Sequence, residues 1–231
     1  MANIAEKSDF QSPRQNVIDF LADFTAETTP FSAAKVDDFR EILRPGTTVF
    51  ITFLPGSDFE DTIAIAARLK KEGLNPVPHL AARSIPDAAF LDEGLRRLRG
   101  EADIDEVLTI AGAVDQPLGA FSDSMQVLET GLLDKHGIKR IGVAGHPEGS
   151  PDMPDEAIAA ALTWKNDFAN RSGADVYIVT QFCFEAEPII AWDKAIRAAG
   201  NALPIRIGVP GLATIKTLLN YAKACGIGNS M

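Results

Sequence analysis

The chain of 231 residues has little cysteine, little histidine and a deficit of positive charge. Its two cysteines, Cys183 and Cys225, are distant and lie in apolar surroundings, so we expect both to be reduced, as in an intracellular protein. Lys and Arg number 22 against 32 Asp and Glu, a net charge of -10, whereas a nucleic-acid partner requires a basic face. No apolar run approaches the ~18 residues of a membrane span, and the N-terminus lacks a signal-peptide pattern. These absences predict a cytoplasmic protein with neither a nucleic-acid nor a membrane partner.

Short apolar, β-rich runs alternate with longer stretches of helical periodicity. The runs are apolar almost throughout, which is typical of strands covered on both faces. The expected strands are 24–27, 48–54, 76–81, 107–112, 140–146, 176–182 and 205–210. Such alternation predicts a parallel sheet with right-handed crossovers.

Local signals mark where the intervening helices begin and end. Capping residues, prolines and glycines are the usual signals. The expected signals are Ser57 with Glu60 before a helix over 61–72 that stops at Gly73, Pro86 before a helix closing near Gly100, Ser122 before a helix ending at 135–137, Asp152 and Pro154 before a helix closing near Gly173, and Ser12–Pro13 before a short N-terminal helix.

About seven strand–helix units can be counted, with no linker to divide them. We therefore expect one domain over 1–231, with an extra helix in 1–22. A doubly wound open sheet needs no fixed number of units, whereas a (β/α)₈ TIM barrel typically needs ~250 residues and an eighth unit. Either the open sheet is right or the chain forms a barrel that lacks its eighth βα unit.

Several apolar strands end in polar residues, at the edge where α/β proteins place their sites. These residues are Glu27, Thr52, His79, Gly112 with Asp115 shortly after, His146 to Glu148, and Gln181. No strand ends in Lys, no His-Glu-x-x-His occurs, and no Gly-x-Gly-x-x-Gly follows the first strand. These absences disfavour a Schiff-base enzyme, a metal hydrolase and a Rossmann nucleotide site, and we expect no metal.

Glu27 stands at the end of the first strand, between Phe24 and Phe31. A carboxyl group in apolar surroundings keeps its proton more readily, which suits a general acid. The plainer alternative is a salt bridge at the rim.

Four segments, in order, resemble the methylenetetrahydrofolate reductase family, a set of flavin-dependent (β/α)₈ enzymes of one-carbon metabolism. They are Gly142-Val-Ala-Gly-His-Pro-Glu-Gly-Ser-Pro151, Gly173-Ala-Asp-Val-Tyr-Ile-Val-Thr-Gln-Phe182, Pro78-His79-Leu80 and Phe24-Thr-Ala-Glu27-Thr-Thr-Pro30. The resemblance runs from about Phe24 to the C-terminus. It implies the barrel reading of the fold and an oxidoreductase that interconverts 5,10-methylenetetrahydrofolate and 5-methyltetrahydrofolate.

The resemblance also implies roles for individual residues. Glu27 takes the place of the catalytic acid, and Gln181 and Asp115 take the places of pterin contacts. The residues at FAD-contacting positions are Thr52, His79, Ala144, His146 and Lys165. NADH or NADPH would supply the hydride.

The loop after the fourth strand departs from the family pattern. It reads Ala111-Gly-Ala-Val-Asp115 where the family usually has Arg-Gly-Asp or Gly-Gly-Asp, so Asp115 is displaced by about two residues. Two alternatives therefore stay open: direct hydride transfer from NAD(P)H without a flavin, and a folate- or flavin-binding relative without turnover. A barrel lacking its last strand would leave two unpaired edges, which favour a homo-oligomer or instability.

Overall fold

The structure is a computed structural model, and it describes residues 12–150, 153–211, 214 and 216. The strands are β1 (Ala26–Thr28), β2 (Thr48–Ile51), β3 (Asn75–Ala81), β4 (Glu106–Ile110), β5 (Arg140–Gly145), β6 (Asp175–Phe182) and β7 (Ile205–Gly208). The helices are α1 (Pro13–Phe20), α2 (Pro30–Ala33), α3 (Phe59–Lys71), α4 (Ala88–Ala102), α5 (Ser124–Glu129), α6 (Leu132–Lys135), α7 (Asp155–Ser172) and α8 (Ala186–Ala198), with 3₁₀ turns η1 (Phe39–Glu41) and η2 (Ala82–Ser84).

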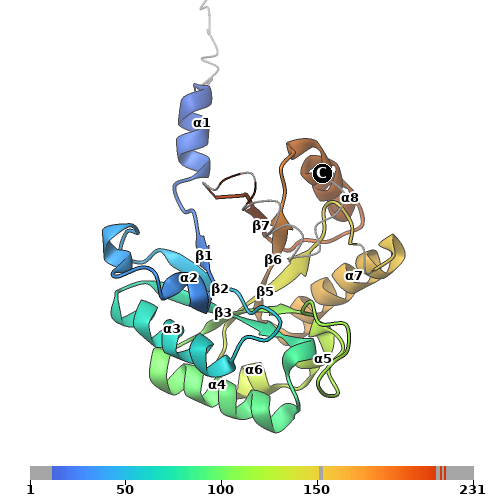
Figure 1. Ribbon diagram of the computed structural model, residues 1–231. Coiled ribbons are helices and arrows are strands. Elements are labelled where there is room, and N and C mark those ends of the chain that lie inside the picture. Colours follow the sequence, from blue (N-terminus) through green and yellow to red (C-terminus); the bar gives the residue numbers. More distant parts are fainter. Residues whose placement is uncertain (1–11, 151–152, 212–213, 215, 217–231) are drawn as a thin grey trace, which may run out of the picture.

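The seven strands form one parallel sheet in the order of the sequence, β1 to β7. The sheet curls into a partial barrel, and the helices that follow the strands lie on its outside (Figure 1). A doubly wound sheet would reverse its strand order in the middle, and this sheet does not. The expected TIM-barrel type without an eighth unit is confirmed for the described residues, where β1 and β7 each pair on one side only.

Alternating side chains divide the core into two parts. The larger part packs between the strands and the helices, and it includes Val49, Ile51 and Leu95. The smaller part fills the inside of the curl with Phe50, Val77, Leu108 and Tyr177. Because residues two apart share a face of a strand, Phe50 directs Thr52 inward and Val77 directs His79 inward. Strand pleating therefore aims the predicted site residues at the centre of the barrel.

Three expected helix caps shift by one residue because an aspartate follows each expected residue, and the helix expected over 61–72 begins earlier, at Phe59. Asp58, Asp87 and Asp123 cap α3, α4 and α5 in place of Ser57, Pro86 and Ser122. Their carboxylates accept hydrogen bonds from the backbone N–H groups of the first turn, as favourable N-cap residues do.

Two expected helix bounds differ by more. The helix expected over 122–137 divides into α5 and α6, because Gly131 takes a left-handed conformation with φ of 69°. The helix expected to close near Gly100 continues to Ala102 and ends on Asp103, also in a left-handed conformation. The start signal at Asp152 lies outside the described residues, whereas Gly173 ends α7 as expected.

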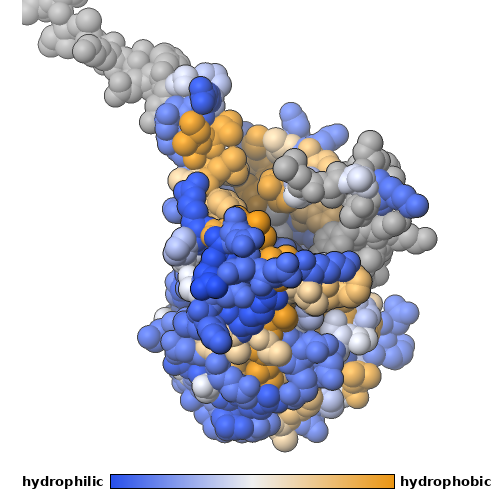
Figure 2. Space-filling model, turned by 60° about the vertical axis from the view of Figure 1, so that its left-hand side comes forward, coloured by the Kyte–Doolittle hydropathy of each residue, from blue (hydrophilic) through white to orange (hydrophobic). Residues whose placement is uncertain are grey.

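Helix α1 stands away from the barrel (Figure 1), and none of its residues is buried. Its apolar side chains Val17, Ile18 and Phe20 are exposed, as the apolar patch on this segment in Figure 2 shows.

Of the two cysteines, which were expected to be reduced, Cys183 is a buried free thiol, and Cys225 lies outside the described residues. No helix among the described residues is long and apolar enough to span a membrane.

Candidate active site

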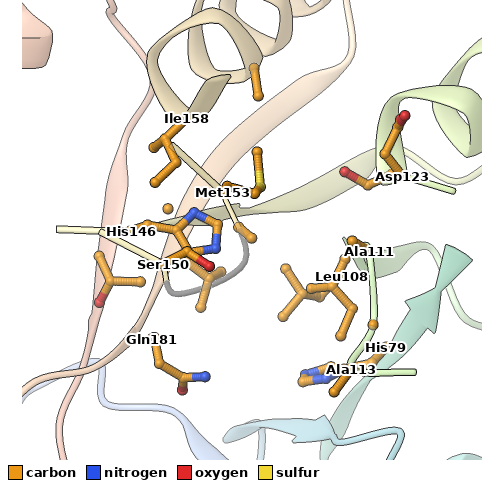
Figure 3. Close-up of a pocket in the computed structure, with 18 of the residues that line it drawn as sticks. His79, Leu108, Ala111, Ala113, Asp123, His146, Ser150, Met153, Ile158 and Gln181 are labelled. Atoms are coloured by element: carbon orange, nitrogen blue, oxygen red, sulfur yellow. The ribbon is translucent and has the colours of Figure 1, made fainter. Parts of the chain in front are cut away.

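One cavity of about 290 Å³ opens at the carboxyl ends of the strands (Figure 3). Its wall is built by the ends of β1 to β6, by the loops that follow them and by one face of α7. Seven of the residues predicted from the sequence line it together. They are Glu27, Thr52, His79, Ala144, His146, Lys165 and Gln181.

The Glu27 carboxylate faces the cavity from β1. The Thr52 hydroxyl donates a hydrogen bond to its Oε1 atom, and the backbone N–H of Thr52 donates to the Thr28 carbonyl at 2.8 Å. The expected burial of Glu27 between aromatic rings is wrong, because its side chain is exposed and Phe24 and Phe31 are 41% and 74% exposed. Among the described residues β1 is an edge strand, so no described strand covers its other side. The Thr52 hydroxyl, rather than an apolar pocket, orients this carboxylate.

His79 brings an unsatisfied polar group to the cavity wall. Its imidazole is only 6% exposed, and neither ring nitrogen has a hydrogen-bond partner among the described residues. The ring meets Phe50 edge to face, with 6.0 Å between the centroids. Burial lowers the pKa of His79, and the nearby charge of Glu27 opposes that shift. A buried imidazole without a partner is costly, so a polar ligand atom would complete this side of the cavity.

Lys165 places a buried ammonium in the cavity wall. It lies on α7 and donates a hydrogen bond of 3.0 Å from Nζ to the Ala144 carbonyl of β5. Burial lowers its pKa to about 8, with Asp123 opposing the shift. Burial also lowers the pKa of His146 to about 4, and the charge of Lys165 adds to this effect. At neutral pH the wall therefore holds a cationic Lys165 beside a neutral His146.

The segment after β4 meets the cavity through a different acid from the one expected. Asp115 is exposed and does not line the cavity, whereas Asp123 does. The Asp123 carboxylate accepts hydrogen bonds from the backbone N–H groups of Met125 at 2.9 Å and Gln126 at 3.1 Å. Asp123 and His146 lie on opposite sides of the cavity in the view of Figure 3. The spacing Asp123-x-x-Gln126, which is a capping-box pattern, was the available signal for this residue.

Gln181 and Cys183 form the β6 side of the cavity. The Gln181 side chain is exposed, and its Oε1 atom accepts a hydrogen bond from the backbone N–H of Phe182 at 3.1 Å. The Cys183 thiol donates to the Gln181 carbonyl at 3.3 Å, and burial raises the pKa of this thiol to about 11. Cys183 is thus an unreactive thiol at neutral pH. Within the described ranges, no group of three or more His, Cys, Asp or Glu side chains could hold a metal ion.

The curled parallel sheet and the cavity at its carboxyl end define the chain as a barrel-type α/β protein with a strand-end site. The sequence model of methylenetetrahydrofolate reductase matches residues 33–229, and the chain belongs to that family. The resemblance read from the sequence is thereby confirmed.

Two curated relatives match over shorter segments. Methylenetetrahydrofolate reductase 2 of Saccharomyces cerevisiae is 31% identical over 83 residues, and methylenetetrahydrofolate reductase 1 of Schizosaccharomyces pombe is 39% identical over 88 residues. The matches cover 36% and 38% of this chain but only 14% of each relative.

Two solved structures are weakly similar. A Serratia marcescens short-chain dehydrogenase/reductase has a TM-score of 0.31 at 17% identity, with 58% of this chain and 62% of that chain covered. A beta-porphyranase of glycoside hydrolase family 86 from Bacteroides plebeius has a TM-score of 0.34 at 14% identity, with 85% and 46% covered. Both values are too low to support any argument.

Proposed function

We propose that the chain is a folate-linked oxidoreductase that interconverts 5,10-methylenetetrahydrofolate and 5-methyltetrahydrofolate, with Glu27 as the general acid. The observation that carries the proposal is the meeting of Glu27, His79 and Gln181 in one strand-end cavity of a chain that belongs to this family. The cavity has the position and the mixture of apolar wall and few polar groups that small-molecule sites show.

The residues present suit a bound heteroaromatic cofactor such as FAD. The imidazole nitrogens of His79 are buried at the cavity wall without partners in the part of the chain that the structure describes, so they can bond a polar ring edge. Lys165 supplies a cation from the α7 side, and Thr52, Ala144 and His146 complete the set assigned to the cofactor. A reduced flavin supplies a hydride when bound, with NADH or NADPH as the external donor.

The proton chemistry falls to Glu27. The methylene bridge of the substrate joins two nitrogens, and it must open to an iminium before its carbon can accept a hydride. Opening requires a proton at the leaving nitrogen, which Glu27 delivers directly or through one water. The hydrogen bond from Thr52 sets the direction of the carboxyl group.

Gln181 is proposed to orient the pterin. Its Oε1 atom is engaged by the Phe182 N–H group, so its amide N–H groups are the donors that can bond the pterin edge. We assign no pterin contact to Asp115, because its side chain does not line the cavity.

Direct hydride transfer from NAD(P)H remains the second candidate, because Ala111, Gly112 and Ala113 line the β4 side where the family pattern carries an arginine or a glycine. The absorbance spectrum of the purified protein separates the two. An absorbance band at 450 nm, intrinsic or after addition of FAD, supports the flavin. Turnover without any such band supports direct transfer, and flavin or folate binding without turnover indicates a non-catalytic relative.

Glu27→Gln tests the assignment of the acid. Hydride exchange between nicotinamide and flavin needs no proton at a folate nitrogen, so that half-reaction should continue at its normal rate. The folate half-reaction should fall by ~10²–10⁴-fold, the usual contribution of a general acid. Rapid mixing measures the two half-reactions separately, and Thr52→Val, which removes only the orienting hydroxyl, should give a smaller loss. Normal folate reduction by Glu27→Gln would end the proposal.

A further inference from the structure

The loop between β4 and α5, residues 111–123, forms one wall of the cavity. Ala111, Gly112, Ala113 and Asp123 all line the cavity, yet the loop has no helix or strand of its own. Its position must therefore come from contacts with the rest of the molecule.

Arg83, in the 3₁₀ turn directly after β3, makes those contacts at four points. Its backbone N–H donates to the Ala111 carbonyl at 2.9 Å, and its carbonyl accepts from the Leu118 N–H at 2.8 Å. Its Nε atom donates to the Ser122 carbonyl at 2.9 Å, and Nη1 lies 3.5 Å from the Val114 carbonyl. The bonds thus extend from one end of the loop to the other.

Two glycines allow the loop to approach the end of β3 this closely. A Cβ atom at Gly112, where φ is 91°, would lie 3.1 Å from the Ala81 Cβ atom. A Cβ atom at Gly119 would lie only 1.7 Å from the Pro86 carbonyl oxygen. Any side chain at position 119 would therefore displace the loop from the segment that carries Arg83.

Arg83 lines the cavity, and its guanidinium has no ion pair with a carboxylate in the described part of the chain. The contacts of the guanidinium described above both run to carbonyl groups of one loop. Arg197 offers a comparison, since it also donates to two loop carbonyls, those of Asn201 and Leu203, at 3.0 and 2.8 Å. Arg197, however, pairs with Asp193 and lies away from the cavity.

We propose that Arg83 is a positioning residue of the site, which fixes the β4–α5 loop and with it the Asp123 carboxylate in the cavity wall. Asp123 is held from two sides. Its carboxylate caps α5, and the carbonyl of the adjacent Ser122 accepts a hydrogen bond from Arg83. Loss of the guanidinium releases the loop, moves Asp123 and weakens ligand binding. The identity of the ligand rests on the function proposed above, whereas the role of Arg83 in the loop does not.

The test compares Arg83→Met with the matched control Arg197→Met in the full chain. Amide hydrogen exchange over residues 111–122 should accelerate about tenfold or more in Arg83→Met, the effect of losing charge-assisted hydrogen bonds, and should be unchanged in the control. Titration with FAD and with 5-methyltetrahydrofolate should show about a tenfold or larger rise in the dissociation constant of at least one of them. Arg83→Lys, which can still reach one carbonyl, should recover part of both effects.

Gly119→Ala displaces the same loop without touching Arg83 and should reproduce both changes. Unchanged amide exchange in Arg83→Met overturns the proposal. Accelerated exchange in both Arg83→Met and Gly119→Ala, with unaltered affinity for FAD and for 5-methyltetrahydrofolate, also overturns it. If the wild-type chain binds neither FAD nor 5-methyltetrahydrofolate, the proposed function is wrong, and the exchange comparison alone decides the role of Arg83.

Discussion

The buried ammonium of Lys165 makes the free energy of unfolding of this protein vary with pH in the alkaline range. Its pKa is about 8 in the folded chain, against about 10.4 for an unperturbed lysine. Between these values the unfolded state binds more protons, so the free energy of unfolding rises with pH. Below pH 8 both states are protonated, and the folded state carries the full cost of a buried charge.

Lys165→Met should remove this dependence. Within the window from about pH 8 to about pH 10, the free energy of unfolding of the wild type should rise relative to that of the variant. The rise should be up to about 1.4 kcal/mol for each pH unit. Urea denaturation of both proteins at a series of pH values measures the difference, in which other titrating groups cancel. A difference that stays constant from pH 7 to 10 would show that Lys165 titrates normally.

A second prediction at the residue scale concerns Gln181→Leu. The variant removes the amide donors of an exposed side chain, so the folate should lose about 1–3 kcal/mol of binding free energy through unpaired polar groups. Thermal stability should change little because the side chain is exposed. Isothermal titration with 5-methyltetrahydrofolate and a melting curve report the two quantities. Normal affinity with a lowered melting temperature would indicate that Gln181 only stabilises its own loop.

At the scale of elements, the packing of strand β5 against β6 and α8 requires a glycine at position 145. A Cβ atom at Gly145 would lie 2.4 Å from Ile178 Cγ2 and 3.0 Å from the Trp192 ring. Gly145→Ala should therefore lower the free energy of unfolding by about 1–3 kcal/mol, the usual cost of an overpacked core.

Gly100→Ala is the matched control on α4. Apart from its chain neighbours and the backbone of its own helix, no described atom lies within 4 Å of its added Cβ. The helix should therefore gain about 0.5–1 kcal/mol from the higher helix propensity of alanine. Denaturant titration of the two variants should move the midpoint in opposite directions. A neutral Gly145→Ala would mean that α8 can shift away from β5.

At the scale of the whole molecule, a polar cluster around the buried Glu106 and Tyr177 joins the four strands β4 to β7 at the amino end of the barrel. The Tyr177 hydroxyl donates to Glu106 Oε1 at 2.6 Å, and Arg140 pairs with Glu106 at 3.3 Å. The guanidinium of Arg206, on the edge strand β7, lies 4.6 Å from the centroid of the Tyr177 ring. The cluster therefore connects β7 to the interior where the described sheet has no further strand.

Tyr177→Phe should weaken this connection without altering the cavity at the other end. The buried Glu106 carboxylate loses one donor, so the free energy of unfolding should fall by about 1–3 kcal/mol. Thr163→Ala, which removes an exposed hydroxyl bonded to the Ala159 carbonyl, should stay within about 0.5 kcal/mol. Chemical denaturation compares the two. Equal stability of Tyr177→Phe and the wild type would show that the two arginines satisfy Glu106 alone.

The two edges of the partial barrel are the features on which the expected homo-oligomer rests. Strands β1 and β7 each pair on one side among the described residues, and α1 exposes Val17, Ile18 and Phe20. A homo-oligomer, like a cytoplasmic location, stays a prediction from the sequence.

The sequence by itself determined the strands, their parallel orientation and seven of the residues that line the cavity. Strands that are covered on both faces are easily recognised in a sequence as apolar runs, because burial on two sides tolerates few polar residues. The residues that end these runs, such as His79, His146 and Gln181, therefore reach the same edge of the sheet. Strand alternation decides which of them face inward, and the structure shows which face that is, because Phe50 and Val77 lie inside the curl.

Only the tertiary structure decided the exposure of Glu27 and the choice of Asp123 over Asp115. Glu27 is exposed because β1 is an edge strand of the described sheet, and an edge position depends on strand pairing rather than on the apolar neighbours of Glu27 in the sequence. Asp123 reaches the cavity because Arg83 and the close approach at Gly119 determine the path of the β4–α5 loop. Those partners are about 30 residues or more apart in the chain, so no local pattern encodes the path: contacts formed on folding determine a loop, whereas its own periodicity determines a strand.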